Sequence, residues 1–170
     1  MRVLSKQDAL RALERVRREL DVTDTGCVMC AVFRQAQDSL IFETEAGRVL
    51  LDRFGNRFGH LLIISRQHVE RGTQLGWQQY RDLQRLAFDA SCALEAVLNP
   101  ARVYVAALGS SEPISTSYPH YHIHVVPIAE HDEDARPARV FSWSTGIIQY
   151  DEEEARQLVA RLRAAWPQGA

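Results

Sequence analysis

Three of the six histidines in this chain stand at alternate positions of one short segment, at His120, His122 and His124. Side chains two residues apart point the same way from a β-strand, whereas on a helix they point to different sides. We therefore expect a strand over residues 120–128 that carries three imidazoles in a row along one face of a sheet. The residues between them are apolar and are expected to face the core: Tyr121, Ile123 and Val125.

A row of imidazoles allows three interpretations. The rings could hydrogen-bond locally on a half-buried strand, but each buried ring then needs its own polar partner, so three on one face multiply the cost. They could bind a metal, since neutral imidazole is a common metal ligand. They could also carry catalysis, because an imidazole with a pKa of about 6.5 is largely neutral and nucleophilic at pH 7.

A second group of chemical interest is the pair Cys27 and Cys30, which are separated by two residues. The chain has three cysteines, and an odd number with one close pair is not typical of a disulfide framework. A pair at this spacing is a common half-site for tetrahedral zinc, and it also occurs in redox-active dithiols. Free buried thiols are the remaining interpretation. Cys92 stands alone in an expected helix, where a small core residue is the simplest role.

Apolar periodicity and turn residues predict the elements that must position these groups. Residues 21–30 read as a turn that holds the cysteine pair, and residues 109–118 read as a polar loop that leads into the histidine strand. Because neighbouring strands are joined by mostly short connections, we expect an α+β fold with a mainly antiparallel sheet. The expected strands are 39–44, 48–53, 60–65, 102–108 and 120–128, and the expected helices are 5–20, 74–98 and 152–165.

The bulk properties restrict the classes of partner. A chain of 170 residues corresponds to one ordinary domain with a core of its own. The formal net charge is -2, so the basic surface of a nucleic-acid-binding domain is absent and we expect no nucleic-acid partner. No apolar run is long enough to span a membrane, so no membrane partner is expected either. The first 20 residues read as a helix rather than a signal peptide, which predicts a cytoplasmic protein.

Four segments in order carry a family resemblance. Residues 120–127, His-Tyr-His-Ile-His-Val-Val-Pro, resemble the motif of the histidine-triad (HIT) family, in which three histidines alternate with apolar residues. Residues 58–68 resemble the family's Gly-His strand, followed by a basic turn and a second histidine. Leu50-Leu51-Asp52 resembles the apolar-Asp step before that strand. Cys27 and Cys30 stand where the zinc-binding members of the family carry their Cys-x-x-Cys pair.

The resemblance implies a HIT-like fold and a division of the chain. The family has a five-stranded, mainly antiparallel sheet with a long helix, and two subunits usually pair into a homodimer. The HIT domain would span residues 25–130. An N-terminal helical extension over 1–24 and a C-terminal extension over 131–170 would add helices to the same domain. The dimer contact would involve the main helix and the strand after it, about residues 74–108.

The resemblance also implies a reaction. Family members are nucleotide hydrolases or transferases that act at the α-phosphate of nucleoside phosphoramidates, aminoacyl nucleotides or dinucleoside polyphosphates. The middle histidine of the motif attacks phosphorus, which assigns the nucleophile to His122 and a nucleotidyl-histidine intermediate to this chain. His124 would donate to the phosphate oxygens, Ser117 would lie near the leaving group, and Asp52 would accept from the ribose hydroxyls. A solvated carboxylate at the end of a strand is the plainer interpretation of Asp52.

The loop before the motif departs from the family pattern. Family members commonly carry Gly-Gln-Ser or Gly-Gln-Thr there, and this chain has Ser115-Thr116-Ser117. Thr116 stands in the glutamine position and has no amide donor, so its contact with phosphate is expected to be weaker. The alternative function is therefore a zinc-stabilised HIT module that binds a nucleotide but turns over little.

The zinc ligands are also implied by the resemblance. Zinc-binding members use the Cys-x-x-Cys pair, the histidine after the Gly-His strand and the first histidine of the motif. In this chain these positions are Cys27, Cys30, His68 and His120. Two thiolates and two imidazoles form a regular ligand set for structural zinc. The metal would leave His122 and His124 free for phosphate.

Overall fold

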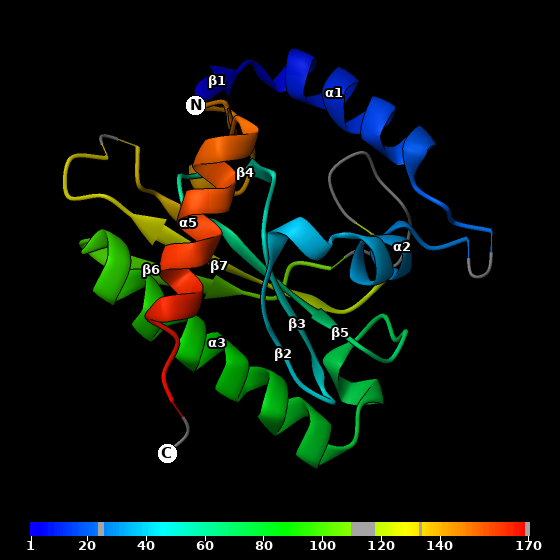
Figure 1. Ribbon diagram of the computed structural model, residues 1–170. Helices are drawn as coiled ribbons and strands as arrows, with labels where there is room; N and C mark the ends of the chain where they lie inside the picture. Colours follow the sequence, from blue (N-terminus) through cyan, green and yellow to red (C-terminus); the bar gives the residue numbers. More distant parts are fainter. Residues whose placement is uncertain (24–25, 110–117, 133, 169–170) are drawn as a thin grey trace.

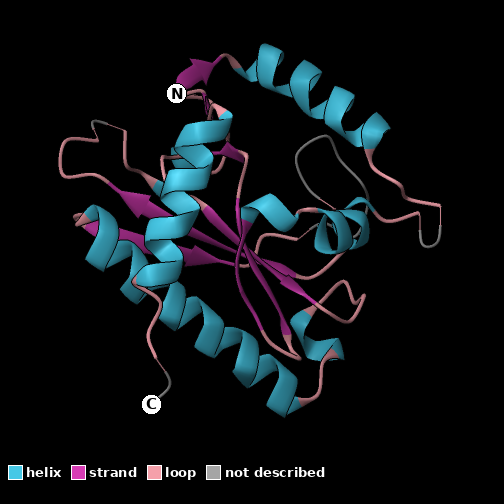
Figure 2. Ribbon diagram, in the orientation of Figure 1, coloured by secondary structure: helices cyan, strands magenta, loops and turns pink. Residues whose placement is uncertain are grey.

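The computed structural model describes residues 1–23, 26–109, 118–132 and 134–168 of the chain (Figures 1 and 2). Its centre is a five-stranded sheet in the order β2-β3-β5-β7-β6, with every neighbouring pair antiparallel. The strands are β2 (Leu40–Glu43), β3 (Gly47–Leu51), β5 (Leu61–Ser65), β7 (His122–Ile128) and β6 (Arg102–Ala106). The expected α+β fold and the five-stranded antiparallel sheet are confirmed.

Two helices cover one face of this sheet. The long helix α3 (Trp77–Leu98) and the helix α5 (Glu152–Ala164) both lie against it, and both contribute to the main core cluster (Figure 1). Ile63, Ile123 and Val125 fill that cluster from the strands. The helix α3 ends at Asn99, which adopts the left-handed conformation with φ 47° ahead of Pro100, as the Asn-Pro stop signal predicts. The final helix therefore belongs to the core and does not lie over the histidines.

The opposite face of the sheet carries the motif histidines. Residues paired directly across antiparallel strands point to the same side, and His122 pairs with Ile64 while His124 pairs with Leu62. Two apolar clusters lie on this face. The first centres on α2 (Val28–Gln35) and includes Met29. The second joins the short helix α4 (Pro137–Val140) to Val126 and Ile128 of β7. His124 contacts the second cluster directly through Phe141.

The helix α2 corrects the expectation of a turn over residues 21–30. Cys27 caps the helix, with its sulfur accepting from the amide of Cys30 at 3.5 Å, so the cysteine pair begins a helix rather than occupying a free turn. The helix is short and contains Val28 and Val32, whose branched side chains weaken helix propensity. Packing of its apolar side against Leu50 and Ile64 of the sheet outweighs that weak propensity.

A second, small sheet was not expected. It has the order β1-β8-β4 and is built from β1 (Arg2–Leu4), β8 (Ile147–Gln149) and β4 (Phe54–Gly55). The strands expected from the sequence include none at residues 54–55 and none at either end of the chain. Strands of two or three residues are too short to show an alternating pattern. This sheet ties both terminal extensions to the segment that follows Asp52.

The helix α1 (Lys6–Glu19) confirms the expected N-terminal helix, with Ser5 accepting from the amide of Asp8 as its cap. The chain also forms two 3-10 turns, η1 (Gln37–Ser39) and η2 (Gly72–Gln74). In the part of the chain that the structure describes, no helix is both long and apolar enough to cross a membrane.

Candidate functional site

His122 lies near the start of β7 with only 4 % of its surface exposed. Its Nδ1 lies 2.6 Å from the backbone carbonyl oxygen of His120, and a carbonyl can only accept. Nδ1 therefore carries the proton and donates it, which leaves the lone pair on Nε2. Burial lowers the pKa of His122 below its ordinary value, although the hydrogen bond to His120 acts the other way. The ring is thus held as a neutral imidazole with an unprotonated Nε2.

His124 is oriented by His60, which opens the neighbouring strand. His60 Nε2 lies 3.0 Å from His124 Nδ1. The amide of Asn56 donates to His60 Nδ1 at 3.1 Å, so the proton of a neutral His60 is on Nε2 and is donated to His124. His124 then carries its own proton on Nε2. Burial lowers the pKa of both histidines, which keeps the relay neutral near pH 7.

Gly59 allows this placement of His60. Its φ of +86° is a backbone conformation that L side chains rarely adopt, and an added Cβ would overlap the side chain of Leu98. Its amide donates to the hydroxyl oxygen of Tyr150 at 2.7 Å. The glycine before the expected strand is therefore a structural requirement for the tight turn that delivers His60.

Asp52 follows β3 and lies beside the same relay. Its Oδ2 is 3.2 Å from His60 Nδ1, and its Oδ1 accepts from the amide of Phe54 at 2.9 Å. The side chain is 18 % exposed, so the carboxylate is largely enclosed but reachable. The structure thus shows a carboxylate fixed by the backbone amide of Phe54 beside His60, in place of a freely solvated one.

His120 does not stand in a row with the other two histidines, and the expected row of three imidazoles is wrong at this position. The strand β7 begins at His122, and the amide of Tyr121 donates to the carbonyl of Val69 instead of continuing the ladder. The ring of His120 turns away toward the cysteines. Its Nε2 lies 2.9 Å from the carbonyl oxygen of Ser65, so Nε2 donates there and Nδ1 carries a lone pair.

That lone pair belongs to a candidate metal centre. Donor atoms of Cys27, Cys30, His68 and His120 all lie within 4.8 Å of one another. The Cys30 sulfur is 3.3 Å from His68 Nδ1 and 3.4 Å from His120 Nδ1, and the Cys27 sulfur is 3.6 Å from His120 Nδ1. Two sulfurs and two ring nitrogens converging on one point fit tetrahedral zinc.

The surroundings of these donors support the same fit. The bond from His120 to the Ser65 carbonyl fixes the tautomer that a metal ligand needs, as outer partners of zinc-bound histidines usually do. The four residues come from the start of α2, the turn after β5 and the segment before β7. The metal centre therefore joins three parts of the chain, and the predicted ligand set is brought together as the resemblance implied.

Two residues that the sequence predicted to contact the substrate are not among the described residues. Thr116 and Ser117, which were expected near the phosphate and the leaving group, lie outside the described residues. Sequence reasoning also missed contributors that the structure places here. Phe141 of the C-terminal extension lies edge-on to the His124 ring, with the ring centroids 5.8 Å apart. No motif could have revealed Phe141 or Asn56, because each acts only through long-range packing or its backbone.

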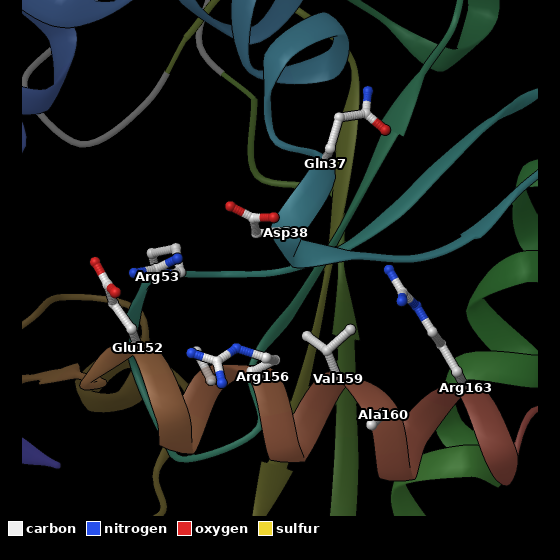
Figure 3. Close-up of a pocket in the computed structure, with 9 residues that line it drawn as sticks. Gln37, Asp38, Arg53, Glu152, Arg156, Val159, Ala160 and Arg163 are labelled. Atoms are coloured by element: carbon white, nitrogen blue, oxygen red, sulfur yellow. The ribbon is translucent and has the colours of Figure 1, made fainter.

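The cavity shown in Figure 3 is a separate feature. It has a volume of about 390 Å³ and lies along α5, between that helix, η1 and the loop after β3. Its lining contains neither Asp52 nor any motif histidine, so it is not the candidate site. Its labelled charged side chains are Asp38, Arg53, Glu152, Arg156 and Arg163.

Comparison with known proteins supports this arrangement. The model of the HIT domain family matches residues 34–131. Among curated proteins, none matches the sequence significantly.

Solved structures share the fold. A Hit-like protein involved in cell-cycle regulation from Bartonella henselae is 15 % identical, with a TM-score of 0.66 over 84 % of this chain and 97 % of that one. A zinc-bound histidine triad family protein from Mycobacterium smegmatis is 24 % identical, with a TM-score of 0.61 over 82 % and 91 %. The Plasmodium falciparum diadenosine triphosphate hydrolase is 14 % identical, with a TM-score of 0.58 over 75 % and 76 %.

Proposed function

Because the chain belongs to the histidine-triad family, we propose that it is a nucleotide hydrolase or transferase that cleaves at the α-phosphate, with His122 as the nucleophile. The observation that carries the proposal is the 2.6 Å hydrogen bond from His122 Nδ1 to the His120 carbonyl. It directs the free lone pair to Nε2. A neutral, oriented imidazole in a partly enclosed site is a competent nucleophile.

In the first half-reaction, the lone pair of His122 Nε2 forms a bond to the α-phosphorus. The bond from phosphorus to the leaving group breaks, and the leaving group takes that electron pair and a proton. Ser117, which the resemblance places near the leaving group, is proposed to relay that proton from solvent and so keeps its own hydroxyl. Positive charge that develops on the His122 ring is stabilised through Nδ1–H by the carbonyl of His120.

In the second half-reaction, water attacks the nucleotidyl-histidine. A new P–O bond forms, the P–N bond breaks, and its electron pair returns to His122 Nε2, while the water keeps one proton on the new P–OH group and loses the other to solvent. Phosphate in place of water would make the reaction a transfer. The products of hydrolysis are a nucleoside monophosphate and the restored neutral histidine.

His124 and Asp52 have supporting roles in this proposal. The relay from Asn56 through His60 places a proton on His124 Nε2, which can donate to a phosphate oxygen as negative charge builds up there. Asp52 would accept from the ribose hydroxyls, with its carboxylate already positioned by the amide of Phe54. Thr116 would contact the phosphate with its hydroxyl.

Zinc has a structural role in this proposal. Cys27, Cys30, His68 and His120 would hold it, and its chemistry would be to fix the three chain segments that it joins. The metal leaves the nucleophile free, because His122 is not among its ligands.

The experiment is to incubate the purified protein with adenosine phosphoramidate and with a dinucleoside polyphosphate, and to measure nucleoside monophosphate. The His122→Ala variant should lose turnover and retain nucleotide binding, since the loss falls on the transition state. Quenching in denaturant at alkaline pH, which preserves the acid-labile P–N bond, followed by mass spectrometry should find one nucleotidyl group on the wild-type peptide that contains His122. Wild-type binding without turnover would favour the alternative, a zinc-stabilised nucleotide-binding module. Turnover within tenfold of wild type in His122→Ala would refute the nucleophile.

A further inference from the structure

Arg17 of α1 is a half-buried cation beside the candidate site. Its guanidinium carbon lies 5.2 Å from the centre of the Tyr118 ring, and among the described residues it forms no ion pair. Other arginines on this side are committed to carboxylates, as Arg48 and Arg66 are to Glu43. The residues outside the described ranges include no lysine or arginine, so no further cation can come from them.

Tyr118 supplies a second group without a partner. Within the described part of the chain, its buried hydroxyl oxygen has no hydrogen-bond partner, although the phenol can both donate and accept. An unsatisfied buried hydroxyl is unfavourable, and a ligand oxygen that accepts from it would remove this cost. Tyr118 packs against the α2 cluster and stands two residues before His120, whose carbonyl orients the nucleophile.

The helix α1 carries Arg17 to Tyr118 and has contacts near both of its ends. Near its start, Lys6 donates to the carbonyl of Ser142 at 3.2 Å, beside Phe141 and hence at the His124 end. Near its other end, Arg17 lies over Tyr118 at the α2 end. The rise of about 1.5 Å per residue puts these anchors about 16 Å apart along the helix. The N-terminal extension therefore contacts both the segment beside Phe141 and the segment that leads to His120.

Charge determines what this arrangement can recognise. The described groups of the site are the Asp52 carboxylate and the rings of His60, His122 and His124, with no lysine or arginine among them, so they offer a substrate no permanent positive charge. A polyphosphate brings several negative charges, whereas an amine leaving group brings none. Arg17 and the Tyr118 hydroxyl together offer a cation and an O–H donor, which are the groups that bind phosphate oxygens.

We propose that Arg17 and Tyr118 form a subsite for a second phosphate group of the substrate. The site then favours nucleotides whose leaving group is itself a phosphate, as in dinucleoside polyphosphates, over those whose leaving group is an amine. This inference rests on the proposed function, of which it specifies the substrate class.

The first test compares two substrates in three proteins. Arg17→Gln should lower kcat/KM for a dinucleoside polyphosphate by about tenfold or more and change that for adenosine phosphoramidate by less than about twofold. Arg15→Gln is the matched control, since it removes the same charge from the same helix at an exposed position. It should leave both values unchanged. Equal losses on both substrates in Arg17→Gln, or no loss on either, would overturn the proposal.

The second test isolates the tyrosine hydroxyl. Tyr118→Phe should lower kcat/KM for the dinucleoside polyphosphate alone without lowering the melting temperature, because the hydroxyl has no partner to lose. Tyr104→Phe is the contrasting control. It loses a 2.7 Å hydrogen bond to the Ala135 carbonyl, so it should reduce stability and leave the preference between substrates unchanged. A stability loss in Tyr118→Phe without a change in preference would contradict the subsite.

A binding measurement keeps this inference separate from the proposed function. In the His122→Ala protein, the affinities for adenosine triphosphate and adenosine monophosphate can be measured by calorimetry. Adding Arg17→Gln should weaken binding of the triphosphate and leave binding of the monophosphate unchanged. If the wild type turns nothing over but this difference is found, the subsite stands and the catalytic proposal fails. If turnover is found but the affinities for both nucleotides are independent of Arg17, the catalytic proposal stands and the subsite fails.

Discussion

His60 Nε2 donates to His124 Nδ1 at 3.0 Å, across the neighbouring strands β5 and β7. The direction of this hydrogen bond follows from the amide of Asn56, which occupies the other ring nitrogen of His60. A residue outside the three-histidine motif therefore determines which nitrogen of His124 can face a phosphate.

Replacement of His60 should impair turnover more than binding. His60→Phe keeps an aromatic ring but loses the donor, so His124 can take either tautomer. We expect kcat to fall by about 10- to 100-fold with KM within about twofold. His131→Phe, at an exposed position, is the matched control and should retain full activity. Steady-state kinetics on both variants, with melting temperatures, would decide this, and an unchanged kcat in His60→Phe would exclude the relay.

Replacement of Asp52 should act mainly on substrate binding. Asp52→Asn keeps the size of the side chain but removes the charge that accepts strongly from ribose hydroxyls. We expect KM to rise by about tenfold and kcat to fall by less, since this contact is present in both the ground state and the transition state. The effect should disappear for a substrate that lacks the ribose hydroxyls. A kcat loss larger than the KM rise would instead indicate that Asp52 acts through His60 and does not contact the ribose.

Removal of zinc should destabilise the fold. We expect about one equivalent of zinc per chain in protein purified without a histidine tag, and a melting temperature that falls by about 10 °C or more after chelation. Cys27→Ser and Cys30→Ser should reproduce the loss. Cys92→Ser, on α3 and away from the metal centre, should retain both metal and stability. Metal analysis well below one equivalent, with melting insensitive to chelators, would count against the site.

Stability should depend on pH through the buried histidines. The pKa values of His60 and His124 are lowered in the folded protein because burial disfavours the charged rings. Below pH of about 6.5 the unfolded chain binds protons that the folded chain does not, so stability is full above that pH and falls as the pH decreases. Each such histidine contributes up to about 1.4 kcal/mol per pH unit. Urea denaturation between pH 7.5 and 5 should show a smaller slope for His60→Phe, and parallel slopes would reject the assignment.

The chain should form a homodimer through the region of α3 and β6. The family resemblance suggests this contact, and β6 is an edge strand of the large sheet. Val105 is 47 % exposed and Phe88 is 64 % exposed in this region. Light scattering should give twice the mass of the chain, and Val105→Glu should reduce it to one chain. Val16→Glu, at an exposed apolar position on α1, should not. A monomeric wild type at micromolar concentration would reject the dimer.

The parts of the fold that the sequence predicted are those with long periodic patterns. The helix α3 and the strands of the large sheet show these patterns clearly, because each presents one side to an extensive core. The helix α2 is too short for a clear period, and β1 and β8 pair between the two ends of the chain. Local sequence holds no signal for a contact of that range.

In the site, too, some features follow from local sequence patterns and others depend on contacts between distant residues. The alternation of His122 and His124 predicts their shared face, because strand geometry alone determines it. His120 fits the same alternation, but it lies before the strand and its ring turns to the cysteines. The alternation of histidines in the sequence therefore begins two residues before the strand does. The spacing of Cys27 and Cys30 indicates two of the metal ligands, whereas His68 and His120 come from the resemblance, since residues so far apart in sequence carry no local pattern.

His120 takes part in both centres with different atoms. Its ring nitrogen faces the cysteine sulfurs, and its backbone carbonyl accepts from His122. A single peptide unit thus connects the metal ligand to the group that orients the nucleophile. By thermodynamic reciprocity, if metal binding raises the affinity of the site for a nucleotide through this connection, a bound nucleotide must raise the affinity for the metal by the same free energy. The metal affinity of this chain should therefore be measured both with and without nucleotide, because the two values are expected to differ.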